Sequence, residues 1–462
     1  MNNKFLNQFK NIFFLGIKGV AMTNLAVFLK KMRKNIYGVD VEEEFITDKL
    51  LSKYNILYQN NFNNLPENID LFVYSAAHQG LNNPLTKEAK KRMITVISQA
   101  ELLGEIMKNF QNKIAVSGCH GKTTTSSLLS YALLKLNQKP SYIVGVPFFG
   151  DYQGGDYQEK KYFVVEADEY GINPPIDKMP KFLKLNPDWI ICTNIDFDHP
   201  DVYKDIKDTK SVFLKFFQSK KLIVNIDDEN IKEVVGKIKN NQNIYTYGFS
   251  DKADYQILDW QVNEDGSKFT IKNLGEFKID IFGKHNILNA TAVIVQLLKL
   301  GFDVDKVKEN LKGFIGAKRR MELVFKGDFY IVDDYAHHPQ EIKATLEAAR
   351  ERFKNKRLIV IFQPHTYSRT MSLLNDFKES LEVADIGFLL PIFASARENK
   401  GDFTVSSKDI VSNSKKLFYC ENEDQLLKNL EKILKKNDVV FTMGAGDIYK
   451  LKVKIQNAKV KS

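Results

Sequence analysis

The chain has 462 residues, 44% of them hydrophobic, and a formal net charge of +10 at pH 7. This length predicts two to four domains, and no stretch approaches the roughly 20 apolar residues that a membrane span needs. Only nine of the 67 basic residues are arginine. Because recognition of nucleic acid usually recruits arginine, we expect a solvated, lysine-rich surface, with neither nucleic acid nor a membrane as partner.

The start of the chain and its cysteines bear on the cell compartment. The first residues, Met1 to Phe5, lack the apolar core of a signal peptide. The three cysteines, Cys119, Cys192 and Cys420, lie far apart and form no metal-type spacing. These features predict a protein of the reducing cytoplasm.

The first predicted segment, residues 1–112, alternates apolar strands with helices. Strands are expected at 12–15, 36–39 and 71–74. This alternation predicts an α/β domain of Rossmann type, whose parallel sheet binds ligands at the carboxyl ends of its strands. Gly16 and Gly19 would then approach a diphosphate, and Asp40 would lie near a ribose or base. The dinucleotide fingerprint is absent, because Lys18 and Ala21 replace two of its glycines.

A second segment, residues 113–317, opens with a candidate phosphate loop. Residues 118–125 read Gly-Cys-His-Gly-Lys-Thr-Thr-Thr and lie between an apolar strand and an apolar-periodic helix. Such a loop directs backbone N–H groups and a helix N-terminus toward a polyphosphate. Lys122 would reach the β- and γ-phosphates, and the Thr123 hydroxyl would ligate Mg²⁺. Val116 stands where the usual loop has its first glycine, and an ordinary strand–turn–helix is the alternative.

Polar side chains follow two further strands of this segment. Glu166 follows an apolar strand at 162–165, and His199 follows another at 189–193. The carboxyl ends of parallel strands meet on one edge of a sheet. A carboxylate and an imidazole at that edge would hold a divalent ion against the phosphates. The alternative is that His199 and its neighbouring aspartates only cap the next helix.

The third segment, residues 318–462, is again β/α. Its expected strands lie at 329–332, 358–362, 387–390 and 439–441. Polar loops follow two of them, at residues 333–339 and 363–370, and Arg369 in the second loop would clamp a carboxylate. Gly444 to Asp447 follow the last strand and are either functional or a plain turn.

Taken in order, these motifs resemble the Mur ligase family over nearly the whole chain. They are Gly-x-His-Gly-Lys-Thr-Thr-Thr, Glu-Ala-Asp-Glu, Asn-x₃-Asp-His, Gly-x-His-Asn-x-x-Asn, Arg-Arg-x-Glu, Asp-Asp-Tyr-x-His-His-Pro and Gly-Ala-Gly-Asp. The resemblance implies an α/β fold of three domains. These are an N-terminal Rossmann-like UDP-sugar domain (1–112), a central P-loop ATPase (113–317) and a C-terminal Rossmann-like amino-acid domain (318–462).

The resemblance also implies roles for individual residues. The catalytic residues would be Lys122, Glu166, His199 and Asn194, with metal ligands Thr123, Glu166 and His199. ATP would be bound by Gly118, His120, Gly121, Lys122, Thr123, Thr124, His285, Asn286, Asn289, Arg319 (or Arg320), Asp334, Tyr335 and His337. The substrates would be bound by Gly16, Gly19, Met22, Asp40 and Ser75 for the UDP-sugar, and by His365 and Arg369 for the amino acid.

The implied activity is ATP-dependent ligation of L-alanine to UDP-N-acetylmuramate through an acyl phosphate, with ATP and two Mg²⁺ ions. A monomer or weak homodimer is expected. The alternative acceptor is a murein tripeptide, because the segment from Glu166 to Leu183 resembles the recycling ligases. Four departures from the family pattern bear on the substrates: Lys18, Ala21 and His78 near the sugar nucleotide, and Thr366 near the amino acid.

Overall fold

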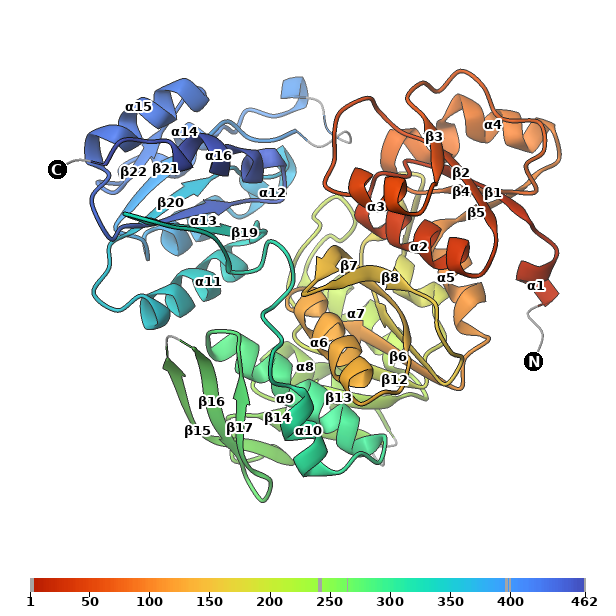
Figure 1. Ribbon diagram of the computed structural model, residues 1–462, viewed down its shortest axis with the longest axis horizontal. Helices are drawn as coiled ribbons and strands as arrows, with labels where there is room; N and C mark the ends of the chain where they lie inside the picture. Colours follow the sequence, from red (N-terminus) through yellow and green to blue (C-terminus); the bar gives the residue numbers. More distant parts are fainter. Residues whose placement is uncertain (1–3, 240–242, 264, 395–397, 399, 461–462) are drawn as a thin grey trace. The chain divides into compact units, whose positions relative to one another are not determined.

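The structure, a computed structural model, describes residues 4–239, 243–263, 265–394, 398 and 400–460. The chain forms two compact units (Figure 1). The first unit comprises Met1–Asp259, Thr270–Phe277 and Leu288–Ile315. The second comprises Trp260–Phe269, Lys278–Ile287 and Gly316–Ser462.

The first unit begins with a five-stranded sheet in the order β3-β2-β1-β4-β5, in which every neighbouring pair is parallel. Its strands are β1 Asn11–Leu15, β2 Asn35–Val39, β3 Leu57–Gln59, β4 Leu71–Tyr74 and β5 Thr95–Ser98. Its helices are α1 Lys4–Asn7, α2 Val20–Lys31, α3 Asp48–Lys53, α4 Pro84–Lys91 and α5 Gln99–Met107. The Rossmann-type parallel sheet expected from the alternating pattern is confirmed.

A ten-stranded sheet follows, in the order β17-β16-β15-β14-β13-β12-β6-β9-β7-β8. Its strands are β6 Asn112–Ser117, β7 Ser141–Phe149, β8 Tyr152–Asp156, β9 Tyr162–Glu166, β12 Trp189–Cys192, β13 Lys221–Asn225, β14 Ile244–Gly248, β15 Tyr255–Asn263, β16 Gly266–Ile271 and β17 Gly275–Ile279. The central pairs β9–β6 and β6–β12 are parallel, so the carboxyl ends of these strands share one edge.

The remaining elements of this part of the chain connect and cover that sheet. The hairpin β10 Gly171–Asn173 and β11 Asp177–Pro180 stands apart as a two-stranded sheet. The helices are α6 Lys122–Lys135, α7 Ile206–Phe217, α8 Glu229–Val235, α9 Lys284–Lys299 and α10 Val304–Asn310, with the 3₁₀ turn η2 Lys181–Lys184. The other 3₁₀ turn, η1 Ala77–Asn82, follows β4 of the five-stranded sheet.

Helix α2 joins the five-stranded sheet to the ten-stranded one. The buried Asn24 side chain on α2 donates hydrogen bonds to the carbonyl oxygens of Val144 and Val146 on β7, at 2.8 and 2.9 Å. A Cβ added at Gly155 on β8 would lie 2.1 Å from the Asn24 carbonyl oxygen. Only a glycine permits this approach, and the five-stranded sheet therefore packs with the β7–β8 side of the ten-stranded sheet in one compact unit.

The second unit contains a six-stranded sheet in the order β18-β19-β23-β20-β21-β22, antiparallel only at β18–β19. Its strands are β18 Glu322–Lys326, β19 Tyr330–Asp334, β20 Leu358–Phe362, β21 Ile386–Leu389, β22 Leu417–Tyr419 and β23 Val439–Met443. Its helices are α11 Pro339–Arg352, α12 Tyr367–Ser372, α13 Leu374–Leu381, α14 Ser407–Val411, α15 Glu423–Ile433 and α16 Lys452–Gln456, with the 3₁₀ turns η3 Lys400–Asp402 and η4 Asp447–Leu451.

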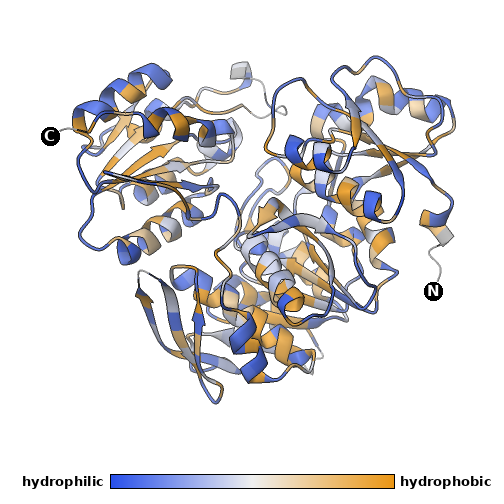
Figure 2. Cartoon of the chain, in the orientation of Figure 1, coloured by the Kyte–Doolittle hydropathy of each residue, from blue (hydrophilic) through white to orange (hydrophobic). Residues whose placement is uncertain are grey.

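Two apolar cores cover the faces of this sheet. Residues of α11 and α13 pack on one face, and residues of α15 and α16 pack on the other. Figure 2 shows the strands of the sheet as predominantly hydrophobic and the outer sides of α11 and α15 as hydrophilic. Among the described residues, no helix is both long enough and apolar enough to cross a membrane.

Candidate active site

The loop between β6 and α6 has a conformation that glycine makes possible. Gly118 has φ +125° and Gly121 has φ +80°. A Cβ at Gly118 would lie 2.2 Å from the Thr193 Oγ1, and one at Gly121 would lie 2.7 Å from the Asn289 Oδ1. Both glycines are therefore required by the backbone angle and by close neighbours. Asn289 therefore lies directly beside the start of α6, a contact that the sequence did not predict.

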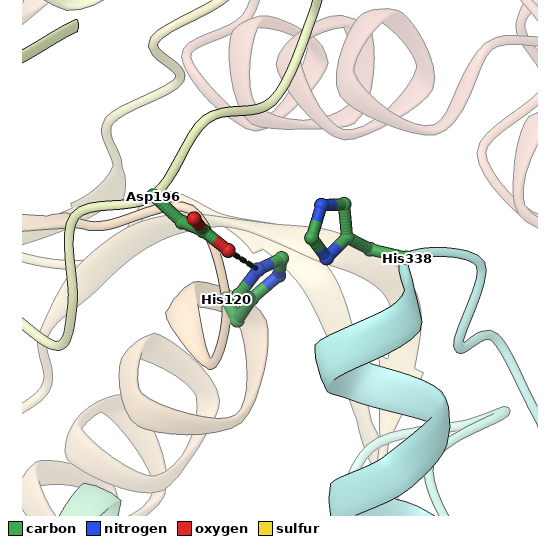
Figure 3. Close-up of side chains that lie close together, drawn as sticks. All are labelled: His120, Asp196 and His338. Carbon is green, nitrogen blue, oxygen red and sulfur yellow. Dashed lines mark ion pairs between the residues drawn. The ribbon is translucent and has the colours of Figure 1, made fainter. Parts of the chain in front are cut away.

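The side-chain amide of Asn194 binds the backbone of the same loop at His120. Its Oδ1 accepts the His120 N–H at 2.9 Å, and its Nδ2 donates to the His120 carbonyl at 2.9 Å. The His120 imidazole lies 3.5 Å from the Asp196 carboxylate (Figure 3). Asn194 and Asp196, which follow β12, thus fix the shape of the loop after β6.

The Lys122 ammonium is folded onto its own loop and onto a buried carboxylate. Its Nζ donates to the carbonyl oxygens of Gly118 and Cys119 at 2.6 and 3.1 Å, and to both oxygens of Glu169 at 2.8 and 3.0 Å. Burial lowers the pKa of Lys122, but the surrounding carboxylates, Glu169 first, outweigh burial and hold that pKa above its usual range. Lys122 is therefore a fixed cation at the N-terminus of α6.

Thr123 and Glu166 meet at the ends of β9 and α6. Glu166 is the last residue of β9, and its Oε2 accepts a hydrogen bond from the Thr123 hydroxyl at 3.0 Å. A hydroxyl and a carboxylate in contact at a helix N-terminus are oxygen ligands suited to Mg²⁺. The structure thus brings together two of the three predicted metal ligands.

His199 lies in a neighbouring acidic cluster. One ligand atom from each of Asp168, Glu169 and His199 lies within 4.8 Å of the others. The His199 Nε2 is 3.5 Å from Glu169 and 3.6 Å from Asp198, and the ring packs edge-on against Tyr170. His199 has φ +61°, an uncommon backbone angle for a residue with a side chain. Two carboxylates and one imidazole are a donor set that fits a divalent cation.

The predicted sugar-nucleotide residues gather at the carboxyl end of β1 and β2. Gly16 has φ +79°, and a Cβ there would lie 3.2 Å from the His78 ring. Asp40 is 3% exposed, and its carboxylate accepts the Lys18 backbone N–H at 2.7 Å and contacts the His78 Nε2 at 3.1 Å. Two of the departures from the family pattern, Lys18 and His78, are therefore linked through one aspartate.

The Lys18 side chain is enclosed. It is 2% exposed, its Nζ donates to the Glu43 carbonyl at 2.8 Å, and the ammonium lies over the rings of Phe45 and Tyr58. Three predicted residues of this group remain. Gly19 is the N-cap of α2, and its N–H donates to the Gly16 carbonyl at 3.3 Å. Met22 is buried on α2, and the Ser75 hydroxyl accepts the Ala77 N–H at 3.3 Å after β4.

The second unit contains a charged cluster. Its residues lie at the start of α9 and on both sides of β19. The guanidinium of Arg320 is 3.6 Å from Glu341, and Glu341 is 3.2 Å from the His337 Nδ1. Burial and the Arg320 charge lower the pKa of His285 to about 4. Asn286, also at the start of α9, donates to the Phe282 carbonyl at 2.8 Å. Most of the predicted nucleotide residues of this unit are thus neighbours.

The side chains of Arg319 and Asp334 form hydrogen bonds with nearby backbone groups. The Arg319 guanidinium donates to the carbonyl oxygens of Gly444 and Gly446, at 2.6 and 3.3 Å. The two oxygens of Asp334 accept the N–H groups of Met321 and Ala336, at 2.8 and 2.7 Å. Asp334 is the last residue of β19, whereas the sequence predicted a loop position. Burial raises the pKa of Asp334 to about 6.

His365 and Arg369 flank the start of α12. The His365 ring stacks on Phe393, with 5.8 Å between the centroids, and lies 6.1 Å from the ring of His337. Arg369 is 5% exposed within α12. Thr366, between them, has φ +70°. The structure therefore brings one predicted amino-acid residue, His365, next to one predicted nucleotide residue, His337.

Two residues of the first unit were not identified from the sequence as site residues. Glu169 is the buried partner of Lys122, and Lys181 donates to Asp168 at 2.7 Å. The four-residue motif that contains Glu166 also contains Glu169, so the motif was the available signal. Its partner could not be deduced, because Lys122 and Glu169 are 47 positions apart.

Three family descriptions match the chain. "Mur ligase family, catalytic domain" matches residues 11–111, "Mur ligase middle domain" matches residues 116–297, and "Mur ligase, glutamate ligase domain" matches residues 319–446.

Individual relatives match over almost their full length. A UDP-N-acetylmuramate–L-alanine ligase of Lactobacillus helveticus is 39% identical over 455 residues, covering 96% of this chain and 98% of the relative. One of Streptococcus equi subsp. zooepidemicus is 38% identical, covering 95% of each. Among solved structures, the UDP-N-acetylmuramate–alanine ligase of Thermotoga maritima superimposes with a TM-score of 0.79 at 26% identity, covering 96% of this chain and 98% of that one. A murein peptide ligase of Psychrobacter arcticus shares the fold, with a TM-score of 0.73, 23% identity and coverage of 97% and 98%.

Proposed function

This chain belongs to the Mur ligase family, and from that premise we propose that it joins L-alanine to the lactyl carboxylate of UDP-N-acetylmuramate at the expense of ATP. This would be the first peptide step in the synthesis of peptidoglycan precursors. The observation that carries the proposal is the group of Lys122, Thr123 and Glu166 at the N-terminus of α6, beside full-length similarity to L-alanine ligases.

We assign the γ-phosphate side of ATP to the loop from Gly118 to Thr124. Its backbone N–H groups and the start of α6 suit a polyphosphate, and Asn194 keeps the loop in shape. Lys122 would exchange Glu169 for phosphate oxygens, which leaves its charge in place beside the transferring group. In phosphoryl transfer the protein mainly positions groups and neutralises charge.

Two divalent-cation positions follow from the donor sets. Thr123 and Glu166 would hold one Mg²⁺, and His199 with Glu169 and Asp168 would hold the second. Bound there, Mg²⁺ would neutralise negative charge that develops on the phosphate oxygens. The sequence grouped Glu166 with His199 at one ion, and the contacts favour a separate position for each of these two residues.

In the second unit, we assign His285 and Asn286 of α9, with Tyr335 and His337, to the nucleotide. In the first unit, we assign Asn289 of α9, which lies beside Gly121, to the nucleotide as well. Arg320 is the better candidate than Arg319 for a phosphate contact, because the Arg319 guanidinium donates to two carbonyl oxygens of the scaffold. His365 and Arg369 would bind the amino acid. Gly16, Gly19, Met22, Asp40 and Ser75 would bind the sugar nucleotide.

The proposed chemistry activates a carboxylate that is otherwise a poor acylating agent. An oxygen of the lactyl carboxylate attacks the γ-phosphorus of ATP, and ADP leaves. The amine of the amino acid then attacks the carbonyl carbon of the acyl phosphate, and phosphate leaves with the oxygen that the carboxylate supplied. The protein excludes water so that the acyl phosphate is not hydrolysed.

An isotope experiment tests this course. With ¹⁸O in the lactyl carboxylate, the proposal predicts one ¹⁸O in each inorganic phosphate released. Release of ADP beyond a single turnover should require both UDP-N-acetylmuramate and the amino acid. Phosphate without ¹⁸O would contradict an acyl phosphate. The alternative acceptor, a murein tripeptide, has less support, because the full-length relatives at 38–39% identity named above are L-alanine ligases.

A further inference from the structure

An open pocket lies in the first unit beside Glu166. The space between its walls is continuous with solvent and amounts to about 570 Å³. Its lining includes Ala21 at the start of α2, Glu166 at the end of β9 and Asp168 just after that strand. Leu103 and Phe182 contribute to an otherwise largely apolar wall. The pocket therefore connects the sugar-nucleotide end of the first sheet with the acidic end of β9.

Lys181 is the one cation among the described residues that line this pocket. Its Nζ donates to the Asp168 Oδ2 at 2.7 Å and lies 5.2 Å from the centroid of the Tyr170 ring. Its backbone N–H donates to the Tyr170 carbonyl at 2.9 Å. Both the backbone and the side chain of Lys181 therefore form hydrogen bonds, and these contacts fix the position of the ammonium at the pocket.

The charges of the lining explain what this ammonium can do. Glu166 and Asp168 give the pocket two carboxylates, which repel any anionic ligand that enters. Lys122 lies at the phosphate loop and is not among the described residues that line this pocket. Lys181 is therefore the group that can offset this repulsion for a carboxylate in the pocket. An ion pair with the partly exposed Asp168 contributes little to folding, so a structural role alone explains the position poorly.

We propose that Lys181 binds the carboxylate of the donor sugar nucleotide in this pocket and directs it toward Thr123 and Glu166. This inference rests on the proposed function. The diphosphate is assigned to the loop at Gly16 and Gly19, two residues before Ala21, so a ligand anchored there carries its sugar into the pocket. The lactyl carboxylate is attached to that sugar, on the side of the diphosphate away from the uridine.

Two sugar nucleotides that differ only in the lactyl group test the proposal. Calorimetry would compare UDP-N-acetylmuramate with UDP-N-acetylglucosamine on the full-length protein and on Lys181→Met, Lys181→Arg and Lys178→Met. Lys178 is an exposed lysine on the preceding strand β11 and serves as the matched control. Because a charge-assisted hydrogen bond is lost, the affinity of Lys181→Met for UDP-N-acetylmuramate should be lower than that of the wild type by about tenfold or more.

The same variant should bind UDP-N-acetylglucosamine as the wild type does, Lys181→Arg should retain most of the muramate affinity, and Lys178→Met should change neither ligand. Equal weakening of both ligands, or of neither, would overturn the inference. A rise confined to the KM for L-alanine would overturn it as well, because Lys181 would then serve the acceptor. Failure of the wild type to bind the muramate would instead refute the proposed function. The ratio of two affinities within one variant is insensitive to partial misfolding.

Discussion

The ammonium of Lys122 lies 2.8 Å from the Oε2 of Glu169, a carboxylate that is 1% exposed. Glu169 thus forms an ion pair with the lysine that is proposed to bind a nucleotide phosphate. It also belongs to the cluster with Asp168 and His199. In the proposed function this carboxylate changes partners, from Lys122 to a divalent cation, when the nucleotide binds.

Glu169→Gln should therefore separate two effects. Without Mg²⁺, ADP should bind the variant several-fold more tightly, because a neutral amide competes less for Lys122. During turnover, the variant should need more Mg²⁺ for half-maximal rate. Calorimetry and a Mg²⁺ titration measure the two effects, with Glu159→Gln, an exposed partner of Lys139, as control. Unchanged ADP affinity and unchanged Mg²⁺ dependence would contradict the exchange of partners.

Glu166→Gln and His199→Ala should each slow ligation strongly. Removal of one charge-stabilising contact typically costs about 10²–10³ in rate. Because the two residues belong to different donor sets, each variant should raise the Mg²⁺ requirement by itself. The measurement is the rate of ADP release over a Mg²⁺ titration, and wild-type rates for His199→Ala at every concentration would refute the second position.

His285 should titrate far below an ordinary histidine. Burial, followed by the Arg320 charge, lowers its pKa from 6.5 to about 4. The unfolded chain takes up this proton near pH 6.5, so the contribution of His285 to the free energy of unfolding is lost as the pH falls from 6.5 to about 4. Asp334 acts in the opposite sense: its pKa of about 6 lets the folded state bind a proton first, which adds stability as the pH falls below 6.

The nitrogen-detected NMR titration of the imidazoles checks this directly, with His285→Gln to assign the signal. The ring of His285 should remain neutral at pH 5. A midpoint near 6.5 would contradict the partly buried position of His285 near the Arg320 charge. A denaturation series at several pH values would then give the sign of the stability change.

Arg369→Ala should weaken the acceptor far more than the nucleotide. Arg369 is buried in α12, one turn after His365. The KM for L-alanine should rise by about tenfold or more, as expected for loss of a charged hydrogen bond, while the KM for ATP changes little. Arg350→Ala, which removes a half-exposed ion pair with Asp385, is the control. Equal changes in the KM for L-alanine and the KM for ATP would contradict the assignment of Arg369 to the amino-acid pocket.

Much of the fold could be predicted from local patterns. The strands β4 and β20 lie where their apolar runs predicted them, and the loop before α6 was identified from its glycines and Lys122. Membership of the family and the α/β, three-domain architecture are confirmed by the comparisons. The domain boundaries and the residue roles stay predictions.

Contacts over long sequence distances could not be predicted. The pairing of Lys122 with Glu169 depends on how β6 and β9 lie in one sheet, and the link from Lys18 through Asp40 to His78 depends on three loops of another. The packing of Asn24 against β7 unites the first two segments. None of these contacts leaves a periodic signal in the sequence, because each joins single side chains of distant elements.

The identity of the acceptor is the central claim, and a direct competition tests it. The protein would be given UDP-N-acetylmuramate, ATP and Mg²⁺ with equal concentrations of L-alanine and the tripeptide L-alanyl-γ-D-glutamyl-diaminopimelate, and the products would be weighed by mass spectrometry. The account predicts UDP-N-acetylmuramoyl-L-alanine as the main product, with slower ligation of glycine when it replaces L-alanine, since one methyl group discriminates by only about 1–3 kcal/mol. Product carrying the tripeptide, with none carrying L-alanine even at high concentration, would contradict it.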